Sequence, residues 1–133
     1  MTMQRSVLVV DANPSDRTST VLLLQTAGYR VASAGDFDEA KQLIASEVPD
    51  LLITDLRLGS YNGLHLILRS RCDHPAMAAL VVSRYPDPVL EAEAQRQNAK
   101  FLLKPLPDSD LLAAITRLLP ALEQAEPSLD SAC

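Results

Sequence analysis

Short apolar segments alternate along this chain with longer stretches in which apolar residues recur every three or four positions. Runs of Val, Leu and Ile are typical of buried β-strands, and the three-to-four spacing is typical of helices with one apolar face. Strands are predicted at residues 7–10, 30–34, 51–54, 80–83 and 100–103. Helices are predicted at residues 14–27, 37–48, 86–97 and 108–119, with a further helix of about two turns starting at residue 64.

Polar and conformationally special residues mark the ends of the first helices. Asn13 suits the N-cap, Pro14 the first helical position, and Asp16 the partner position of a capping box. Gly28 suits the end of that helix, because glycine readily adopts the left-handed conformation. Asp36 can cap the second helix in the same way as Asn13 caps the first.

Five strand–helix units in succession, with largely apolar strands, predict an α/β protein. We expect a doubly wound five-stranded parallel sheet with helices on both faces, the flavodoxin-like (βα)5 arrangement. The 133 residues make one ordinary domain, expected over residues 5–119. Residues 120–133 are polar and unpatterned, and we expect a flexible tail there.

The composition limits the classes of function. The hydrophobic share is 47% and the formal net charge is −5, with a pI near 4.9. An acidic chain is a poor nonspecific binder of nucleic acid, so we expect no direct nucleic-acid binding. We also expect no membrane span and no signal peptide, because the apolar runs are far shorter than the ~20 residues that a membrane helix needs. A cytoplasmic location follows, and Cys72 and Cys133, which form no CxxC pattern, are then expected to be free thiols.

Four residues with reactive or charged side chains stand at the ends of four predicted strands. Asp11 follows the first strand, Asp55 the third, Ser83 ends the fourth and Lys104 follows the fifth. Because the carboxyl ends of parallel strands lie at one edge of the sheet, these side chains should share one site. Neighbouring carboxylates attract a hard cation such as Mg²⁺, and a hydroxyl and an ammonium can hold phosphoryl oxygens. This set favours phosphoryl transfer to a carboxylate.

Four motifs resemble those of receiver domains of two-component response regulators, the CheY-like family. VLVVDANPSDR resembles the first strand with its acidic turn, and LVVSR resembles the fourth strand with its hydroxyl residue. PDLLITDLRLGSYNGL resembles the phosphoacceptor segment, with Gly63 eight positions after Asp55. NAKFLLKPL resembles the fifth strand, with an aromatic residue at Phe101 and a Lys-Pro pair. The resemblance extends over about residues 5–119 and implies a signalling protein rather than an enzyme.

The resemblance also implies roles for individual residues. Asp55 would accept a phosphoryl group from a histidine kinase or a phosphotransfer protein. Asp11, Asp55 and the backbone carbonyl of Arg57 would hold Mg²⁺. Ser83 and Lys104 would bind the phosphoryl oxygens, with the Lys104 ammonium near the Asp55 carboxylate.

A conformational switch is implied as well. Ser83 would draw its loop inward on phosphorylation and let Phe101 turn in. Pro105 would follow a cis peptide bond that directs Lys104 into the site. The changed face would consist of the helix at 86–97, the strand at 100–103 and the helix at 108–119, which could also mediate homodimerisation.

Some positions depart from the family pattern. Ala12 stands where the family usually has a second acidic metal ligand, so Mg²⁺ binding should be weak. Arg84 stands where a small residue is usual; it could contact the phosphoryl group or simply be solvated. Asn98 replaces a common glycine, and Gly59 replaces a frequent proline and should loosen its loop.

Two functional hypotheses remain open at this point. The first is a phosphoacceptor receiver with a weak Mg²⁺ site, supported by Asp55, Ser83 and Lys104 together. The second is a degenerate receiver that acts as a phosphorylation-independent protein-interaction module, supported by Ala12. A flavodoxin-like FMN carrier is less favoured, because no Ser/Thr-rich phosphate loop follows the first strand. The chain could act alone or belong to a larger regulator.

Overall fold

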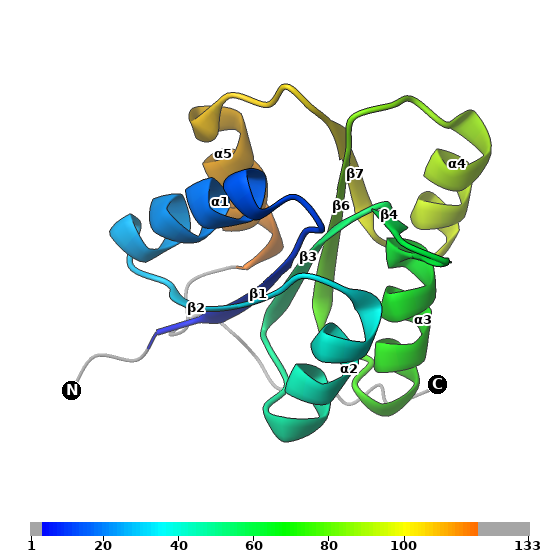
Figure 1. Ribbon diagram of the computed structural model, residues 1–133, viewed down its shortest axis with the longest axis horizontal. Helices are drawn as coiled ribbons and strands as arrows, with labels where there is room; N and C mark the ends of the chain where they lie inside the picture. Colours follow the sequence, from blue (N-terminus) through cyan, green and yellow to red (C-terminus); the bar gives the residue numbers. More distant parts are fainter. Residues whose placement is uncertain (1–3, 120–133) are drawn as a thin grey trace.

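One parallel sheet with helices on both faces makes up the fold of the computed structural model, which describes residues 4–119 (Figure 1). The strands of this sheet are β1 (Ser6–Val10), β2 (Arg30–Ala34), β3 (Leu51–Asp55), β6 (Ala78–Ser83) and β7 (Lys100–Leu103). The helices are α1 (Pro14–Thr26), α2 (Phe37–Ser46), α3 (Gly63–Asp73), α4 (Pro88–Arg96) and α5 (Asp108–Leu118). The predicted doubly wound α/β fold is confirmed. The predicted tail at 120–133 lies outside the described residues.

The strand order, β2-β1-β3-β6-β7, places β1 and β3 side by side near the middle of the sheet. The chain leaves β1 toward β2 on one side and returns to β3 on the other, so the direction of winding changes between β1 and β3. Val10 at the end of β1 is in register with Thr54 near the end of β3. Such a reversal opens a crevice at the carboxyl ends of the strands, where α/β proteins bind their ligands.

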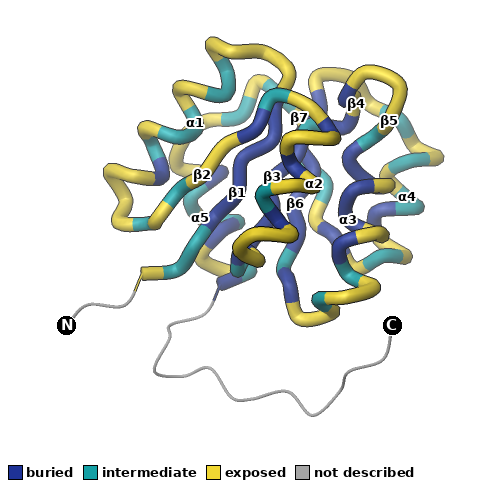
Figure 2. The backbone as a smooth tube through the Cα atoms, turned by 60° about the horizontal axis from the view of Figure 1, so that its bottom comes forward, coloured by how far each residue is buried: buried dark blue, intermediate teal, exposed yellow. Residues whose placement is uncertain are grey.

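Two apolar clusters hold the helices to the sheet. Val7 and Val9 face one cluster with residues of α1 and α5, whereas Leu8 and Val10 face the other with residues of α2, α3 and α4. This alternation follows from the period of two along a strand. Figure 2 shows the central strands β1, β3 and β6 buried between helices that expose their outer faces. None of the helices within residues 4–119 is long and apolar enough to cross a membrane.

The helix starts follow the predicted capping. The Asn13 side chain accepts a hydrogen bond from the Asp16 N–H at 3.0 Å, and Asp36 accepts one from the Glu39 N–H at 2.8 Å. Each bond satisfies a backbone donor that the first turn of a helix leaves free. Asn98 adopts a positive φ of 56°, which asparagine tolerates better than most residues.

The segment after β3 differs from the prediction. The expected loop contains a short antiparallel hairpin of β4 (Arg57–Leu58) and β5 (Tyr61–Asn62), with Gly59 at φ 65° in its two-residue turn. The hairpin is held by the Tyr61 ring, which stacks on Phe37 at 4.4 Å between centroids. The helix that follows, α3, has 11 residues rather than two turns: Asn62 caps its start, and its buried side continues past Ile67 to Ser70.

Candidate functional site

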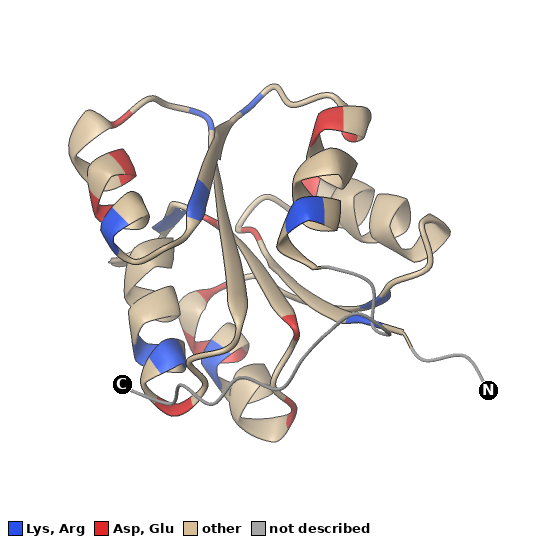
Figure 3. Ribbon diagram, turned by 180° about the vertical axis from the view of Figure 1, so that it is seen from behind, with Lys and Arg blue, Asp and Glu red and all other residues tan. Residues whose placement is uncertain are grey.

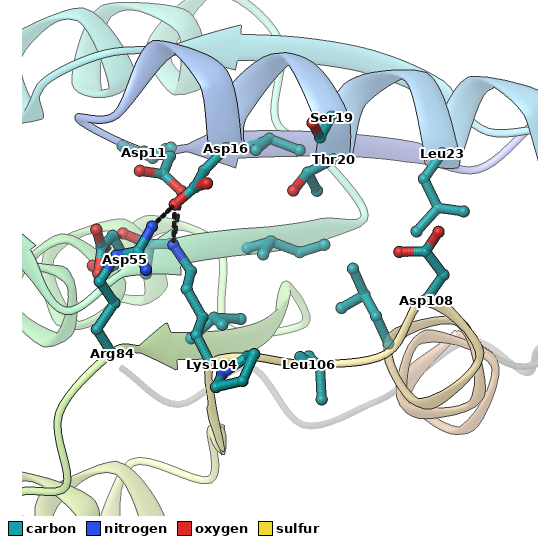
Figure 4. Close-up of a pocket in the computed structure, with 17 residues that line it drawn as sticks. Asp11, Asp16, Ser19, Thr20, Leu23, Asp55, Arg84, Lys104, Leu106 and Asp108 are labelled. Carbon is teal, nitrogen blue, oxygen red and sulfur yellow. Dashed lines mark hydrogen bonds and ion pairs between the residues drawn. The ribbon is translucent and has the colours of Figure 1, made fainter.

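A cavity at the carboxyl edge of the sheet collects most of the predicted site residues. Asp11, Asp55 and Lys104 line it together with Asp16 and Arg84 (Figure 4). The cavity continues between α1 and α5, where its wall includes Thr20, Leu23, Leu106 and Asp108. Three predicted residues, Ser83, Arg57 and Phe101, are not among the residues that line it. The sequence thus predicted the position of the site, but only part of its lining.

Asp55 ends β3, and its backbone is closely packed. Its Oδ1 accepts a hydrogen bond from the Leu56 N–H at 2.8 Å, and the buried Thr54 hydroxyl donates to its carbonyl oxygen at 2.9 Å. Gly63 lies directly against this segment, since a Cβ there would clash with the Asp55 carbonyl and would lie 2.7 Å from Cγ2 of Thr54. Position 63 therefore has room only for glycine, and the close packing holds the Asp55 backbone in one position.

The charge of Asp55 is only partly compensated. Burial raises the pKa of its carboxyl, the nearby charge of Lys104 acts in the opposite direction, and the charge of Asp11 raises it further. Hydrogen bonds from the N–H groups of Leu56 and Arg57 lower the pKa but do not cancel these effects.

Lys104 is bound mainly to the other two acids. Its Nζ donates to Oδ2 of Asp11 at 3.0 Å and to Oδ2 of Asp16 at 3.1 Å. Burial alone would lower the pKa of the ammonium, but the hydrogen bonds and charges of Asp11 and Asp16, with the charge of Asp55, raise it. The ammonium was expected near the Asp55 carboxylate. Its charge does interact with that of Asp55, but its two hydrogen bonds are donated to Asp11 and Asp16. The Lys104–Pro105 peptide bond is cis, as expected.

Asp16 is the site residue that sequence reasoning missed. Half of the predicted capping box is present, because the Asp16 N–H donates to the Asn13 side chain. The Asp16 carboxylate points into the cavity (Figure 4), and the Asn13 N–H donates to Asp11 instead. Its Oδ2 accepts from Lys104 and, at 2.5 Å, from Nη2 of Arg84. The hydrogen bond from Lys104 and the charges of both cations hold the pKa of Asp16 below its ordinary value. Two sequence features could have identified Asp16 as a site residue: an acid in the first turn of α1 and an arginine directly after β6.

The two predicted switch residues are both held inside the protein. The Ser83 hydroxyl donates to the Tyr85 carbonyl at 2.9 Å and accepts from the Tyr85 N–H at 3.2 Å, so it is engaged within its own loop. It is 3% exposed. Phe101 is partly buried and packs against the core cluster on the α2–α4 side.

The oxygens of Asp11 and Asp55 that a magnesium ion would use are partly engaged within the protein. Both oxygens of Asp11 are engaged, Oδ1 by the Asn13 N–H at 2.9 Å and Oδ2 by Lys104. Ala12 is exposed and offers no oxygen from its side chain. Over residues 4–119, no three side chains from His, Cys, Asp and Glu are grouped to hold a metal ion. The Lys104 ammonium bridges Asp11 and Asp16, so a divalent cation would compete with it for Asp11.

Comparison with known proteins decides the family. The family model "Response regulator receiver domain" matches residues 7–116, most of the chain. The chain belongs to the response regulator receiver family. It is similar in structure to a CheY-like receiver domain from Methanospirillum hungatei, with a TM-score of 0.83 at 25% identity, over 86% of this chain and 93% of that one. It is also similar to the chemotaxis protein CheY4 of Vibrio cholerae, with a TM-score of 0.81 at 26% identity, over 88% and 100%.

Curated relatives are longer proteins. The alginate biosynthesis transcriptional regulatory protein AlgB of Pseudomonas aeruginosa is 32% identical over 86% of this chain, which spans 26% of that protein. The transcriptional regulatory protein FixJ of Bradyrhizobium diazoefficiens is 31% identical over 98% of this chain, which spans 63% of that protein. The chain is thus a receiver domain of a two-component response regulator, a class of signalling module that interacts with histidine kinases or phosphotransfer proteins.

Proposed function

We propose that this receiver domain accepts a phosphoryl group on Asp55 from a histidine kinase or a phosphotransfer protein. The observation that supports the proposal most directly is the arrangement around Asp55. Its carboxylate ends β3 on a fixed backbone and lines one cavity with the ammonium of Lys104. A nucleophilic oxygen next to a fixed cation suits attack on an anionic phosphoryl group.

The transfer conserves atoms and charge in a simple way. A carboxylate oxygen of Asp55 attacks the phosphorus, and a P–O bond forms as the bond between phosphorus and the leaving group breaks. The leaving group keeps the electron pair of the broken bond; with acetyl phosphate it is acetate, which needs no proton. Lys104 stabilises the phosphoryl oxygens. The Ser83 hydroxyl joins it once the hydroxyl leaves its bonds with Tyr85. The incomplete acid set makes Mg²⁺ a weakly bound cofactor.

The proposed output is a change in partner affinity rather than catalysis. Ser83 and Phe101 would couple the site to the face formed by α4, β7 and α5. Val89 on α4 and Leu103 on β7 are 73% and 45% exposed, so apolar surface is available on that face for a partner or a second copy.

Basic positions are interspersed with acidic ones in Figure 3, which supports a protein partner rather than direct contact with nucleic acid. We place the domain in the cytoplasm, where histidine kinases present their phosphohistidine.

A second candidate function rests on the same site. The Lys104 ammonium is already satisfied by Asp11 and Asp16, and the Ser83 hydroxyl by Tyr85. A site whose polar groups are paired internally, with Ala12 in place of an acid, also suits a degenerate receiver that binds partners without phosphorylation.

Mass spectrometry of the intact protein separates the two candidates. After incubation with acetyl phosphate, with and without Mg²⁺, the proposal predicts a gain of about 80 Da, the mass of one phosphoryl group. Asp55→Asn should show no gain, whereas Asp73→Asn, a change at an exposed acid at the end of α3, should react like the wild type. No gain with acetyl phosphate or with phosphorylated histidine kinases would support the interaction module.

A further inference from the structure

Two cations, not one, are held at the mouth of the site. Arg84 follows Ser83 at the end of β6, and β6 pairs directly with β3, with Val82 in register with Asp55. The Arg84 guanidinium and the Lys104 ammonium meet on a single oxygen, Oδ2 of Asp16 (Figure 4). We call Asp16, Arg84 and Lys104 the charge cluster.

The charge cluster resembles a phosphoryl-binding site in which the Asp16 carboxylate occupies the place of the phosphoryl group. Both cations converge on one carboxylate oxygen, at 2.5 Å from Arg84 and 3.1 Å from Lys104. A phosphoryl group on Asp55 would bring three anionic oxygens into the same cavity, and arginine binds such oxygens well because its donors form a planar fork. We propose that Arg84 is a second phosphoryl-binding residue beside Lys104, and that Asp16 holds both cations until a phosphoryl group on Asp55 displaces it. This inference rests on the proposed function.

Exposure shows why the exchange is feasible. The side chains of Arg84 and Asp16 are 53% and 30% exposed, whereas those of Lys104 and Asp11 are 16% and 9% exposed. An ion pair near solvent contributes little and breaks readily, so Arg84 can leave Asp16, while the buried Lys104–Asp11 pair stays in place. A phosphoryl group is the stronger ligand because it carries more charge and more acceptor oxygens than one carboxylate.

The exchange compensates for the missing acid at position 12. A site that retains little Mg²⁺ needs another source of positive charge to offset the repulsion between the Asp55 carboxylate and an anionic donor. Arg84 supplies a permanent positive charge from the protein itself, because arginine stays protonated at all ordinary pH values. Because Arg84 lies on the loop between β6 and α4, its move from Asp16 to the phosphoryl group also links the chemistry to the start of α4.

The test measures the rate of Asp55 phosphorylation by acetyl phosphate, by intact mass, in Mg²⁺ and in EDTA. Arg84→Gln should lower the rate in EDTA by about tenfold, and Arg84→Lys should restore most of it, because the charge is retained. Asp16→Asn should raise the rate by about threefold, the scale expected of a partly exposed ion pair. In the double variant the gain from Asp16→Asn should shrink to the part that comes from the released Lys104 ammonium, since the arginine is gone.

A second arginine–acid pair provides matched controls. Arg96 and Glu93 on α4 are 2.5 Å apart and partly exposed, like Arg84 and Asp16, but they do not line the cavity. Arg96→Gln and Glu93→Gln should leave the rate unchanged. If the variants at 84 and 16 behave like these controls while the wild type is phosphorylated, the role of Arg84 is refuted and the proposed function stands. A slower Asp16→Asn would likewise refute the exchange. If the wild type is not phosphorylated at all, the proposed function fails and takes this inference with it.

Discussion

Replacing Ala12 by aspartate should restore a magnesium site. Ala12 directly follows Asp11 and is exposed, so an aspartate there meets no buried surface and leaves the core unchanged. The new carboxylate would add an acid next to Asp11, which lines the cavity together with Asp55. Mg²⁺ binds to sites with one or two carboxylates plus further oxygen ligands, and an additional acid should tighten its binding.

The size of the effect follows from charge. At an effective dielectric constant of ~20, one pair of unit charges ~4 Å apart is worth about 4 kcal/mol before desolvation. Much of this is lost, because Mg²⁺ gives up water and must compete with the Lys104 ammonium, which occupies Oδ2 of Asp11 at 3.0 Å. If about a quarter survives, the gain of about 1 kcal/mol corresponds to between fivefold and tenfold in affinity. Phosphorylation in Mg²⁺ should accelerate in parallel.

Calorimetric or NMR titration with Mg²⁺ measures this affinity directly. Ala12→Asn is the neutral control of similar size, and Ser15→Asp adds an exposed acid to the start of α1 outside the cavity. Neither should tighten Mg²⁺ by more than about twofold, since a distant exposed charge is screened. Equal affinity in Ala12→Asp and the wild type would refute the reasoning, because it would mean that position 12 does not limit the site.

Two further predictions concern stability. Asp55→Asn should stabilise the protein at pH 7 by about 0.5–2 kcal/mol, measured by urea unfolding, since active-site groups are often held at a cost to stability. The pKa of Asp55 is raised in the folded protein, so the ionised carboxylate destabilises the fold at pH values above the unfolded pKa of ~3.9. The extra stability of Asp55→Asn should therefore vanish as the pH falls below that value. Extra stability that does not depend on pH would contradict this cause. Gly63→Ala should cost about 1–3 kcal/mol, because its methyl group would meet the backbone of Asp55. Gly35→Ala, whose methyl group would meet only the Arg17 side chain, should cost clearly less.

The fold followed from the sequence because its signals are local and repeated. Apolar runs and capping residues such as Asn13 and Asp36 act within a few positions, and each agrees with the structure. The hairpin after Asp55 was missed because its strands have two residues each and depend on the stacking of Tyr61 on Phe37. No periodicity along the chain encodes such a contact between distant residues.

The site was predictable where strand ends fix positions, as at Asp11, Asp55 and Lys104. The site was not predictable at positions where the direction of a side chain decides whether the residue belongs to it. Asp16 has the same residue type and spacing whether it caps a helix or enters a cavity. The two cations that bind its carboxylate in the cavity, Arg84 and Lys104, come 68 and 88 residues later in the chain. Ser83 shows the opposite case: its position was correct, but its hydroxyl is bound to its own loop.

The position of β1 in the sheet has a consequence for the order of assembly. Val7 pairs with Val31 and with Leu51, so three strands of the sheet can form from the first 55 residues of the chain. Lys104 follows the last strand to join and reaches the acids only when β7 has paired with β6. During synthesis, therefore, Asp11 and Asp55 emerge well before their counter-charge. A nascent or truncated chain would carry the two acids without the ammonium, and only the completed sheet would bring the three charges together.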